Sequence, residues 1–238
     1  MAISRVVTID GPAGAGKSTV ARLLADRLGW RLLDTGAMYR AVTLAALRAR
    51  LDLGSEADLA RLVGEISVTL PPGLVLLDGE DVTAEIRSVE VTRATRHSAD
   101  SPAVRRKLVA WQHAFAESEA QVVTEGRDQG TIVFPAAFRK FFLTAADEER
   151  ARRRHAELAE KGHAPTTEEI LRDIRERDLG DTRRAIAPMT PAEDARVIDS
   201  TGLDLERVVD LIEREVLRPD EGPRDRPSMT LFSEGGPR

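Results

Sequence analysis

The chain has 238 residues, of which 42% are hydrophobic and 32% are charged, and its formal net charge is −5. A nucleic-acid-binding protein normally carries a basic excess, so we expect no nucleic-acid partner. The absence of Cys excludes disulfides and cysteine metal sites. No signal peptide is recognisable, and no apolar run approaches the roughly 20 residues that span a bilayer, so we expect a cytoplasmic protein without a membrane partner.

The first segments of the chain are typical of a strand, a glycine-rich loop and a helix. Residues 6–9 are a short β-branched run that indicates a buried strand. The loop from Gly11 to Gly16 follows, and residues 18–28 repeat apolar side chains at helical spacing. A second strand over 31–34 and helices over 37–50 and 53–63 are predicted next. This order favours an α/β fold with a parallel sheet.

The hydrophobic period changes between residues 66 and 87. Residues 66–70 alternate between apolar and polar side chains, and Pro71-Pro72-Gly73 indicates a turn. Asp78-Gly79 is typical of a tight hairpin. We therefore predict a small antiparallel β insert in an otherwise parallel core.

The remaining elements complete the α/β pattern. Helices are predicted over 85–99 and 103–117, and a strand over 121–124 leads into Glu125-Gly126-Arg127-Asp128. This strand is expected to lie beside the first one. Further predicted elements are a strand (139–143), an Arg-rich helix (147–161), a charged helix (167–179), a strand (195–199) and a helix (205–217). From residue 219 the composition turns to Pro, Gly and charge, which predicts a disordered tail.

The sequence Gly11-x-x-x-x-Gly16-Lys17-Ser18 fits the Walker A pattern, with a strand before it and a helix after it. Its glycines allow backbone amides to converge on phosphate oxygens, and the helix N-terminus adds positive charge. Lys17 can follow the transferred phosphate, and the Ser18 hydroxyl can bind Mg²⁺. We predict that ATP binds here, with the following contacts: Gly11, Pro12, Ala13, Gly14, Ala15, Gly16, Lys17, Ser18 and Thr19.

Two acidic residues at predicted strand ends are candidates for a role at the metal. A parallel βαβ unit would bring Asp34 to the same edge of the sheet as Lys17, and Glu125 follows a strand in the manner of a Walker B acid. Either acid could bind Mg²⁺ through water, together with Ser18. The alternative is that Asp34 caps a helix and that Glu125 is structural. Motor proteins, GTPases and small-molecule kinases all share the Walker A loop, so the loop alone leaves the acceptor open.

Further segments show a resemblance to a known family. Residues 34–40 (Asp-Thr-Gly-Ala-Met-Tyr-Arg) and 126–131 (Gly-Arg-Asp-Gln-Gly-Thr) resemble those of bacterial cytidylate kinases, which phosphorylate CMP and dCMP. Other matching stretches are 9–19, 78–87, 104–105, 125–135, 175–188 and 199–201. The resemblance covers nearly all of residues 5–217.

The resemblance implies the architecture of a P-loop nucleoside monophosphate kinase. A central parallel five-stranded sheet flanked by helices would form the core (about 1–35, 103–148 and 186–217). A small antiparallel β-containing insert (about 36–102) would bind the nucleoside monophosphate (NMP), and a helical lid (about 149–185) would close over ATP. Residues 1–217 would form one domain, and 218–238 the disordered tail. We expect a monomer.

The resemblance also assigns roles to individual residues. Phosphoryl transfer is expected to depend on Lys17, Arg127, Arg154 and Arg184, and Arg150 is expected to contact ATP. Several Arg forks suit a dianionic phosphate, and a carboxylate such as that of Asp128 can accept from the cytosine amine. The residues implied to contact the monophosphate are Thr35, Tyr39, Arg40, Arg105, Arg127, Asp128, Arg177, Asp181 and Arg184.

One position departs from the family. Cytidylate kinases usually have a Ser about nine residues before the Arg at 105, where it helps to read the base. This chain has Arg96 at that place or, with a shift of one residue, Thr95. Neither is included in the predicted site.

Arg150 and Arg154 are four residues apart, so they share one face of a helix. In related kinases two arginines with this spacing begin a lid, one against adenine and one against phosphate. The alternative is a solvated charged helix. Residues 161–165 would supply flexible joints, and the lid would exclude water from the reaction.

Two other functions stay open. Another small P-loop kinase, acting on UMP or shikimate, would share the loop, but the β insert and Gly126-Arg127-Asp128 argue against shikimate. A non-enzymatic NTP-binding switch is the other alternative, and the chain lacks the Asn-Lys-x-Asp run of GTPases. The function predicted from the resemblance is Mg-dependent transfer of the ATP γ-phosphate to CMP or dCMP, in pyrimidine metabolism.

Overall fold

A computed structural model describes residues 5–160, 162 and 165–219 of the chain. The described part of the chain divides into two compact units, which consist of residues 5–31 and the described residues of 121–219 (unit 1) and residues 32–120 (unit 2). The predicted disordered tail lies outside the described residues from 220 onward, as do residues 161, 163 and 164 of the predicted lid joint.

The central sheet has five strands in the order β2-β6-β1-β7-β8. The strand β1 runs parallel to both β6 and β7, and β7 runs parallel to β8. Ile9 of β1 is opposite Glu125 of β6, which confirms that these two strands are neighbours. Their carboxyl ends therefore share one edge of the sheet. The strands are β1 (Arg5–Asp10), β2 (Arg31–Asp34), β6 (Gln121–Gly126), β7 (Arg139–Thr144) and β8 (Arg196–Asp199).

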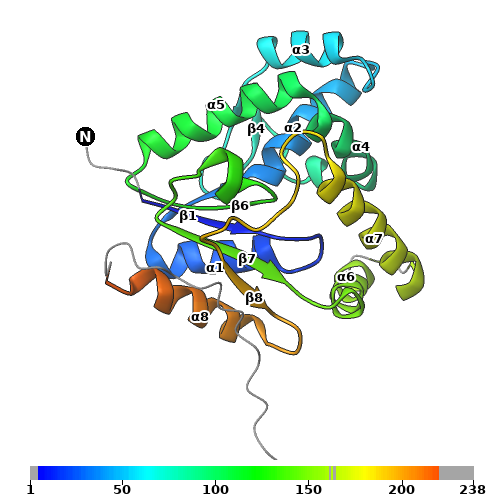
Figure 1. Ribbon diagram of the computed structural model, residues 1–238. Coiled ribbons are helices and arrows are strands. Elements are labelled where there is room, and N and C mark those ends of the chain that lie inside the picture. Colours follow the sequence, from blue (N-terminus) through cyan, green and yellow to red (C-terminus); the bar gives the residue numbers. More distant parts are fainter. Residues whose placement is uncertain (1–4, 161, 163–164, 220–238) are drawn as a thin grey trace, which may run out of the picture. The chain divides into compact units, whose positions relative to one another are not determined.

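Two helices of unit 1, α1 (Lys17–Leu28) and α8 (Leu205–Leu217), lie side by side (Figure 1). Arg27 of α1 forms ion pairs with three acids on one face of α8, namely Glu206, Asp210 and Glu213. The apolar face of α8 carries Val208, Val209, Ile212 and Val216, all buried. Burial and ion pairing together hold α8 in place.

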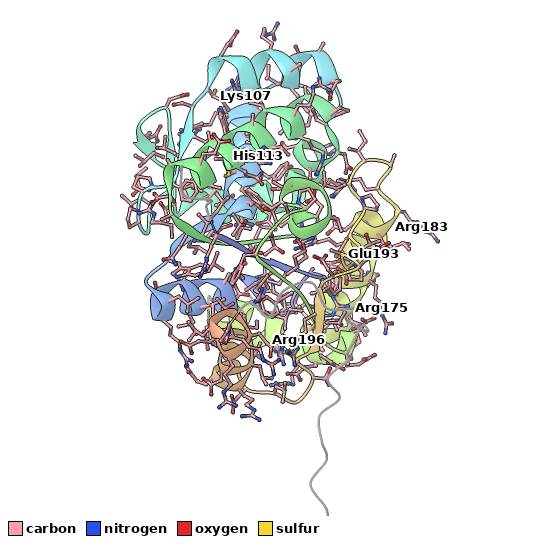
Figure 2. The ribbon with its side chains drawn as sticks, turned by 60° about the vertical axis from the view of Figure 1, so that its left-hand side comes forward. Lys107, His113, Arg175, Arg183, Glu193 and Arg196 are labelled. Carbon is pink, nitrogen blue, oxygen red and sulfur yellow. The ribbon has the colours of Figure 1, made fainter. Side chains whose placement is uncertain are left out.

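A second helix pair in unit 1 consists of α6 (Asp147–Glu160) and α7 (Thr167–Arg183), as Figure 1 shows. Ala151, Ile170 and Ile174 form a small buried core between them. Thr166 and Glu169 form a capping box at the start of α7. The helix α7 ends four residues later than the sequence predicts, and Arg183 near its end points outward (Figure 2).

Unit 2 contains most of the elements between β2 and β6. Its three-stranded antiparallel sheet, in the order β3-β4-β5, confirms the predicted β insert. Asp78 and Gly79 both have positive φ, 50° and 86°, as the predicted hairpin turn requires. The elements are α2 (Thr35–Arg48), α3 (Glu56–Glu65), β3 (Val68–Thr69), β4 (Leu76–Leu77), β5 (Glu80–Asp81), the 3-10 helix η1 (Glu85–Arg87), α4 (Val89–Asp100) and α5 (Pro102–Ser118).

The single helix predicted over 85–99 is wrong. Ser88 adopts an extended conformation, with φ −59° and ψ 157°, which separates η1 from α4. Its side chain accepts a hydrogen bond from the backbone N–H of Val91 and so caps α4. The local preference of Ser for a cap outweighs the helical periodicity that continues across it.

The sheets confirm the predicted fold class: an α/β fold with a five-stranded central sheet flanked by helices and a separate small antiparallel sheet. The predicted division into core, insert and lid stays a prediction. The two units group residues 103–120 with 32–102. No helix in the described part of the chain combines the length and the apolar character needed to cross a membrane.

Candidate functional site

The glycine-rich loop joins β1 to α1, and all three of its glycines have positive φ. A Cβ on Gly11 would lie 2.0 Å from the carbonyl oxygen of Leu143, so no other residue fits there. Gly16 is the N-cap of α1 in the left-handed region and has no side chain with which to cap the helix. The loop therefore combines the backbone shape and the helix N-terminus that suit a phosphate group.

Lys17, the first residue of α1, is buried, and its Nζ donates a hydrogen bond to the carbonyl oxygen of Pro12 at 2.7 Å. Burial, together with the positive charge of Arg127, lowers the pKa of Lys17 to about 7, although Glu125 opposes the shift. A negatively charged ligand beside Nζ would stabilise the ammonium form. The loop lysine thus lies in surroundings that favour binding of an anion.

The predicted Mg²⁺ ligands are compatible with a metal ion that enters the site bound to the phosphates of ATP. Ser18 is exposed in the first turn of α1, and Glu125 is buried at the end of β6. Within the described residues no group of three or more His, Cys, Asp or Glu could hold a metal ion. Mg²⁺ needs only one or two protein ligands when phosphates and water complete its shell. The roles of Ser18, Glu125 and Asp34 at the metal stay predictions.

Three of the predicted acceptor-binding residues of unit 1 meet in one cluster. Asp181 accepts a hydrogen bond from Arg127 Nε at 2.8 Å through one oxygen and from Arg184 Nη2 at 2.7 Å through the other. Burial alone would raise the pKa of Asp181, but the attraction of Arg127 and Arg184 holds this pKa below its usual range. Asp181 thus holds two guanidinium groups together.

The segment that carries Arg127 and Asp128 is fixed by an acid on β1. Asp10 accepts hydrogen bonds from the backbone N–H groups of Gln129 at 2.9 Å and Gly130 at 2.7 Å. These residues begin a π-helix, η2 (Gln129–Val133), which the sequence did not predict. Burial raises the pKa of Asp10 to about 6, although the two N–H donors oppose this shift. Asp128 itself is buried.

The two arginines predicted to begin the lid differ in their surroundings. Arg150 is buried, and its guanidinium binds the carbonyl oxygens of Ala13 and Ala145 and the carboxylates of Asp147 and Asp178. Arg154 has a side chain that is 38% exposed and pairs with Glu157 on its own helix. Arg177 is exposed on α7. The predicted contacts of all three with nucleotides stay predictions.

The predicted acceptor-binding residues of unit 2 lie on α2 and α5. Asp34 caps α2 by accepting from the N–H of Ala37 at 2.8 Å, and its carboxylate lies 3.7 Å from Arg40. The Nε of Arg40 is buried and has no hydrogen-bond partner among the described residues. Arg40 is therefore suited to bind an anion. The guanidinium of Arg105 lies 6.0 Å from the centre of the Tyr39 ring.

The position that departs from the family lies on α4. Thr95 Oγ1 donates a hydrogen bond to the carbonyl oxygen of Val91 at 2.6 Å, one turn earlier in the helix. Arg96 is exposed. Thr95 uses its hydroxyl within the helix, so Arg96 is the residue of this pair that presents its side chain to solvent.

The sequence missed two residues that hold the site in place. Asp178 accepts a hydrogen bond from the N–H of Ala13 at 2.9 Å, across 165 residues of chain. Asp10 directly follows the predicted strand over residues 6–9, and the sequence predicted no role for its side chain. Asp178 lies in a helix whose charged pattern is typical of a solvated surface, so no local signal distinguishes it from its acidic neighbours.

Comparison with known proteins gives a consistent result. A family model described as "Cytidylate kinase" matches residues 7–218. A cytidylate kinase of Pelotomaculum thermopropionicum is 50% identical over 224 residues, which cover 92% of this chain and 97% of the relative. Cytidylate kinases of Desulforamulus reducens and Shewanella halifaxensis are 50% and 46% identical, and the matches cover 87% of this chain and 95% and 92% of those relatives.

Proposed function

Since this chain belongs to the cytidylate kinase family, it is a nucleoside monophosphate kinase, and we propose that it transfers the γ-phosphoryl group of ATP to CMP or dCMP. The observation that carries the proposal is that Lys17 is buried in a glycine-rich loop of unit 1. The same unit contains the cluster of Arg127, Arg184 and Asp181. The products would be CDP or dCDP, in pyrimidine nucleotide metabolism.

The donor would bind at the loop from Gly11 to Thr19. Backbone N–H groups at the start of α1 and the Lys17 ammonium would neutralise the phosphates of ATP. Mg²⁺ would be held by Ser18 and the phosphates, and it would neutralise the charge that develops on the transferred group. Arg154 of α6 would contact the donor phosphates when the lid closes.

The residues proposed to contact the acceptor include several arginines. In unit 2, Arg40 and Arg105 would bind the α-phosphate of CMP, and Tyr39 would orient Arg105, which lies against its ring. In unit 1, Arg127, Arg177 and Arg184 would add positive charge, with Asp181 also binding the sugar. Asp128 would accept from the cytosine amine.

This chemistry requires little proton transfer. The α-phosphate of CMP is already an anion at neutral pH, so the attacking oxygen needs no strong general base. Catalysis would come from positioning the two phosphates in line and from neutralising the charge on the transferred phosphoryl group. A lysine and several arginines supply that charge, which is the arrangement that phosphoryl transfer requires.

A panel of acceptors tests the proposal. ADP release would be measured with CMP, dCMP, UMP, AMP and shikimate at the same ATP and Mg²⁺ concentrations. We expect the highest kcat/KM with CMP and dCMP. Faster turnover of UMP or shikimate, or ATP hydrolysis that no acceptor accelerates, would contradict the proposed acceptor.

The place of action and assembly state belong to the same proposal. A protein that consumes ATP and CMP would work in the cytoplasm, where both occur. We propose that it acts as a monomer. Light scattering at micromolar concentration tests this, and a dimer mass would contradict it.

A further inference from the structure

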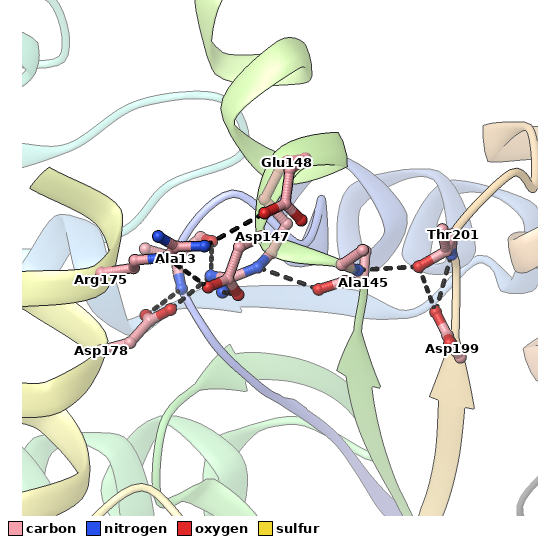
Figure 3. Close-up of polar contacts among 10 residues, drawn as sticks. Ala13, Ala145, Asp147, Glu148, Arg175, Asp178, Asp199 and Thr201 are labelled. Carbon is pink, nitrogen blue, oxygen red and sulfur yellow. Dashed lines mark hydrogen bonds and ion pairs between the residues drawn. The ribbon is translucent and has the colours of Figure 1, made fainter. Parts of the chain in front are cut away.

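Ala13 of the phosphate-binding loop is held at both its N–H and its carbonyl group by charged side chains of the helices α6 and α7. The N–H of Ala13 donates to Asp178 Oδ1 at 2.9 Å, and the carbonyl oxygen of Ala13 accepts from Arg150 Nη1 at 2.7 Å. Asp178 and Arg150 also form an ion pair with each other. Figure 3 shows Ala13 beside Asp178. The two side chains thus fix the orientation of the loop at Ala13.

Arg150 is firmly held in this arrangement. Its side chain is 5% exposed, its Nε donates to the carbonyl oxygen of Ala145 at 3.1 Å, and its Nη2 donates to Asp147 at 2.6 Å. Gly14, the next loop residue, packs so closely that a Cβ there would lie 3.2 Å from the Cβ and carbonyl oxygen of Arg150. The loop therefore packs directly against the backbone of α6.

The helix α7 joins this arrangement through a second ion pair. Asp147 at the start of α6 accepts from Arg175 Nε at 2.8 Å, and Figure 3 shows both residues near Asp178. Ile174 packs into the core between the two helices, and its side chain would lie 3.5 Å from a Cβ on Gly14. The helix α7 and the loop are thus coupled through both charged and apolar contacts.

We propose that Asp178 is a positioning residue for ATP binding, which acts by holding the backbone N–H of Ala13 directly and its carbonyl oxygen through Arg150. The inference rests on the proposed function only in taking ATP as the ligand of the loop. Because the Ala13 N–H is bonded to Asp178, this amide anchors the loop, and the amides that follow it are left to bind phosphate. The same contact joins the loop to the helix that carries Arg177 and Asp181.

The physical reason is that a phosphate-binding loop works by preorganisation. Backbone N–H groups bind phosphate tightly only if they already converge, because a mobile loop must lose conformational entropy when the ligand binds. Hydrogen bonds to charged groups are among the strongest available to hold a loop, and this one is partly buried. Loss of the carboxylate would let the loop move and would leave Arg150 without one of its partners.

The test compares Asp178→Ala and Asp178→Asn with Asp173→Asn, an exposed aspartate on the same helix. ATP affinity of the full-length protein is measured by calorimetric titration with Mg·ATP in the absence of acceptor. We expect Asp178→Ala to weaken ATP binding about 10-fold or more. Asp178→Asn keeps an acceptor for the Ala13 N–H but loses the charge, so we expect a smaller loss, and Asp173→Asn should bind as wild type does.

Steady-state kinetics and thermal unfolding separate positioning from a structural role. The KM for ATP should rise in parallel with the dissociation constant, while the KM for CMP stays within about threefold. A lower unfolding temperature with unchanged ATP affinity would overturn the inference, and so would an equal loss for Asp173→Asn. The ATP titration needs no acceptor, so it tests the inference even if CMP proves to be a poor substrate.

Discussion

Arg127 Nε donates a hydrogen bond to Oδ2 of Asp181 at 2.8 Å and so joins the residue that follows β6 to the C-terminal part of α7. The other oxygen of Asp181 accepts from Arg184. All three side chains are less than one-fifth exposed. The negative charge of this carboxylate allows two guanidinium groups to lie close together. Such a pair of positive charges is suited to an anionic substrate.

Replacement of this carboxylate should impair both the acceptor site and the fold. We expect Asp181→Ala to raise the KM for CMP about 10-fold or more and to lower the free energy of unfolding by about 3 kcal/mol, because two largely buried guanidinium groups lose their counter-charge. Kinetics and urea unfolding measure the two effects. Glu176→Gln, an exposed change in the same helix, is the control, and an unchanged KM for CMP would refute the assigned role.

Lys17 should be required for turnover. We expect Lys17→Met to lower kcat by about 100-fold or more with the fold intact, because the variant cannot neutralise charge on the transferred phosphoryl group. A coupled ADP assay and circular dichroism measure activity and folding. Arg22→Met removes an exposed positive charge from the same helix and should retain activity. Near-normal turnover by Lys17→Met would contradict the assignment of the loop to ATP binding and phosphoryl transfer.

The lowered pKa of Lys17 predicts a dependence of stability on pH. The side chain titrates near 7 in the fold and at 10.5 in the unfolded chain, so between these values the unfolded state binds more protons. The contribution of Lys17 to stability therefore rises with pH across this window, by at most about 1.4 kcal/mol per pH unit.

Urea unfolding of wild type and Lys17→Met isolates this contribution from the other titrating groups. From about pH 7.5 to about pH 9, the wild type should gain about 2 kcal/mol relative to the variant. A binding anion such as ATP should reduce this gain, since it favours the charged amine. Parallel pH profiles of the two proteins would show that burial does not shift the pKa of Lys17.

Gly11 should be far less tolerant of substitution than a glycine with open surroundings. Gly11→Ala would place a Cβ 2.0 Å from the carbonyl oxygen of Leu143, so we expect a loss of several kcal/mol or failure to fold. Gly29→Ala, at the end of α1, has φ +66° and no atom within 4 Å of the added Cβ, so it should cost about 1 kcal/mol. Urea unfolding compares the two, and equal losses would contradict the packing described for Gly11.

Much of the fold could be predicted because its signals are local. The strand that precedes Gly11, the helix that follows it and the Asp78-Gly79 hairpin each have a short-range signature, and all three were confirmed. The break at Ser88 was missed because helical periodicity continues on both sides of it. The π-helix after Asp128 was missed because its first two N–H groups donate to the carboxylate of Asp10, more than a hundred residues earlier in the chain.

By itself the sequence determined the family and the strand, glycine-rich loop and helix at the start of the chain, and it predicted which residues contact two phosphates. These properties depend on residue types at fixed spacing along the chain. Only the tertiary structure decided that Asp181 holds Arg127 beside Arg184, that burial lowers the pKa of Lys17, and that Asp178 holds Ala13. Such partners are far apart in the chain, and burial is a property of the packed fold, so no local pattern can encode either.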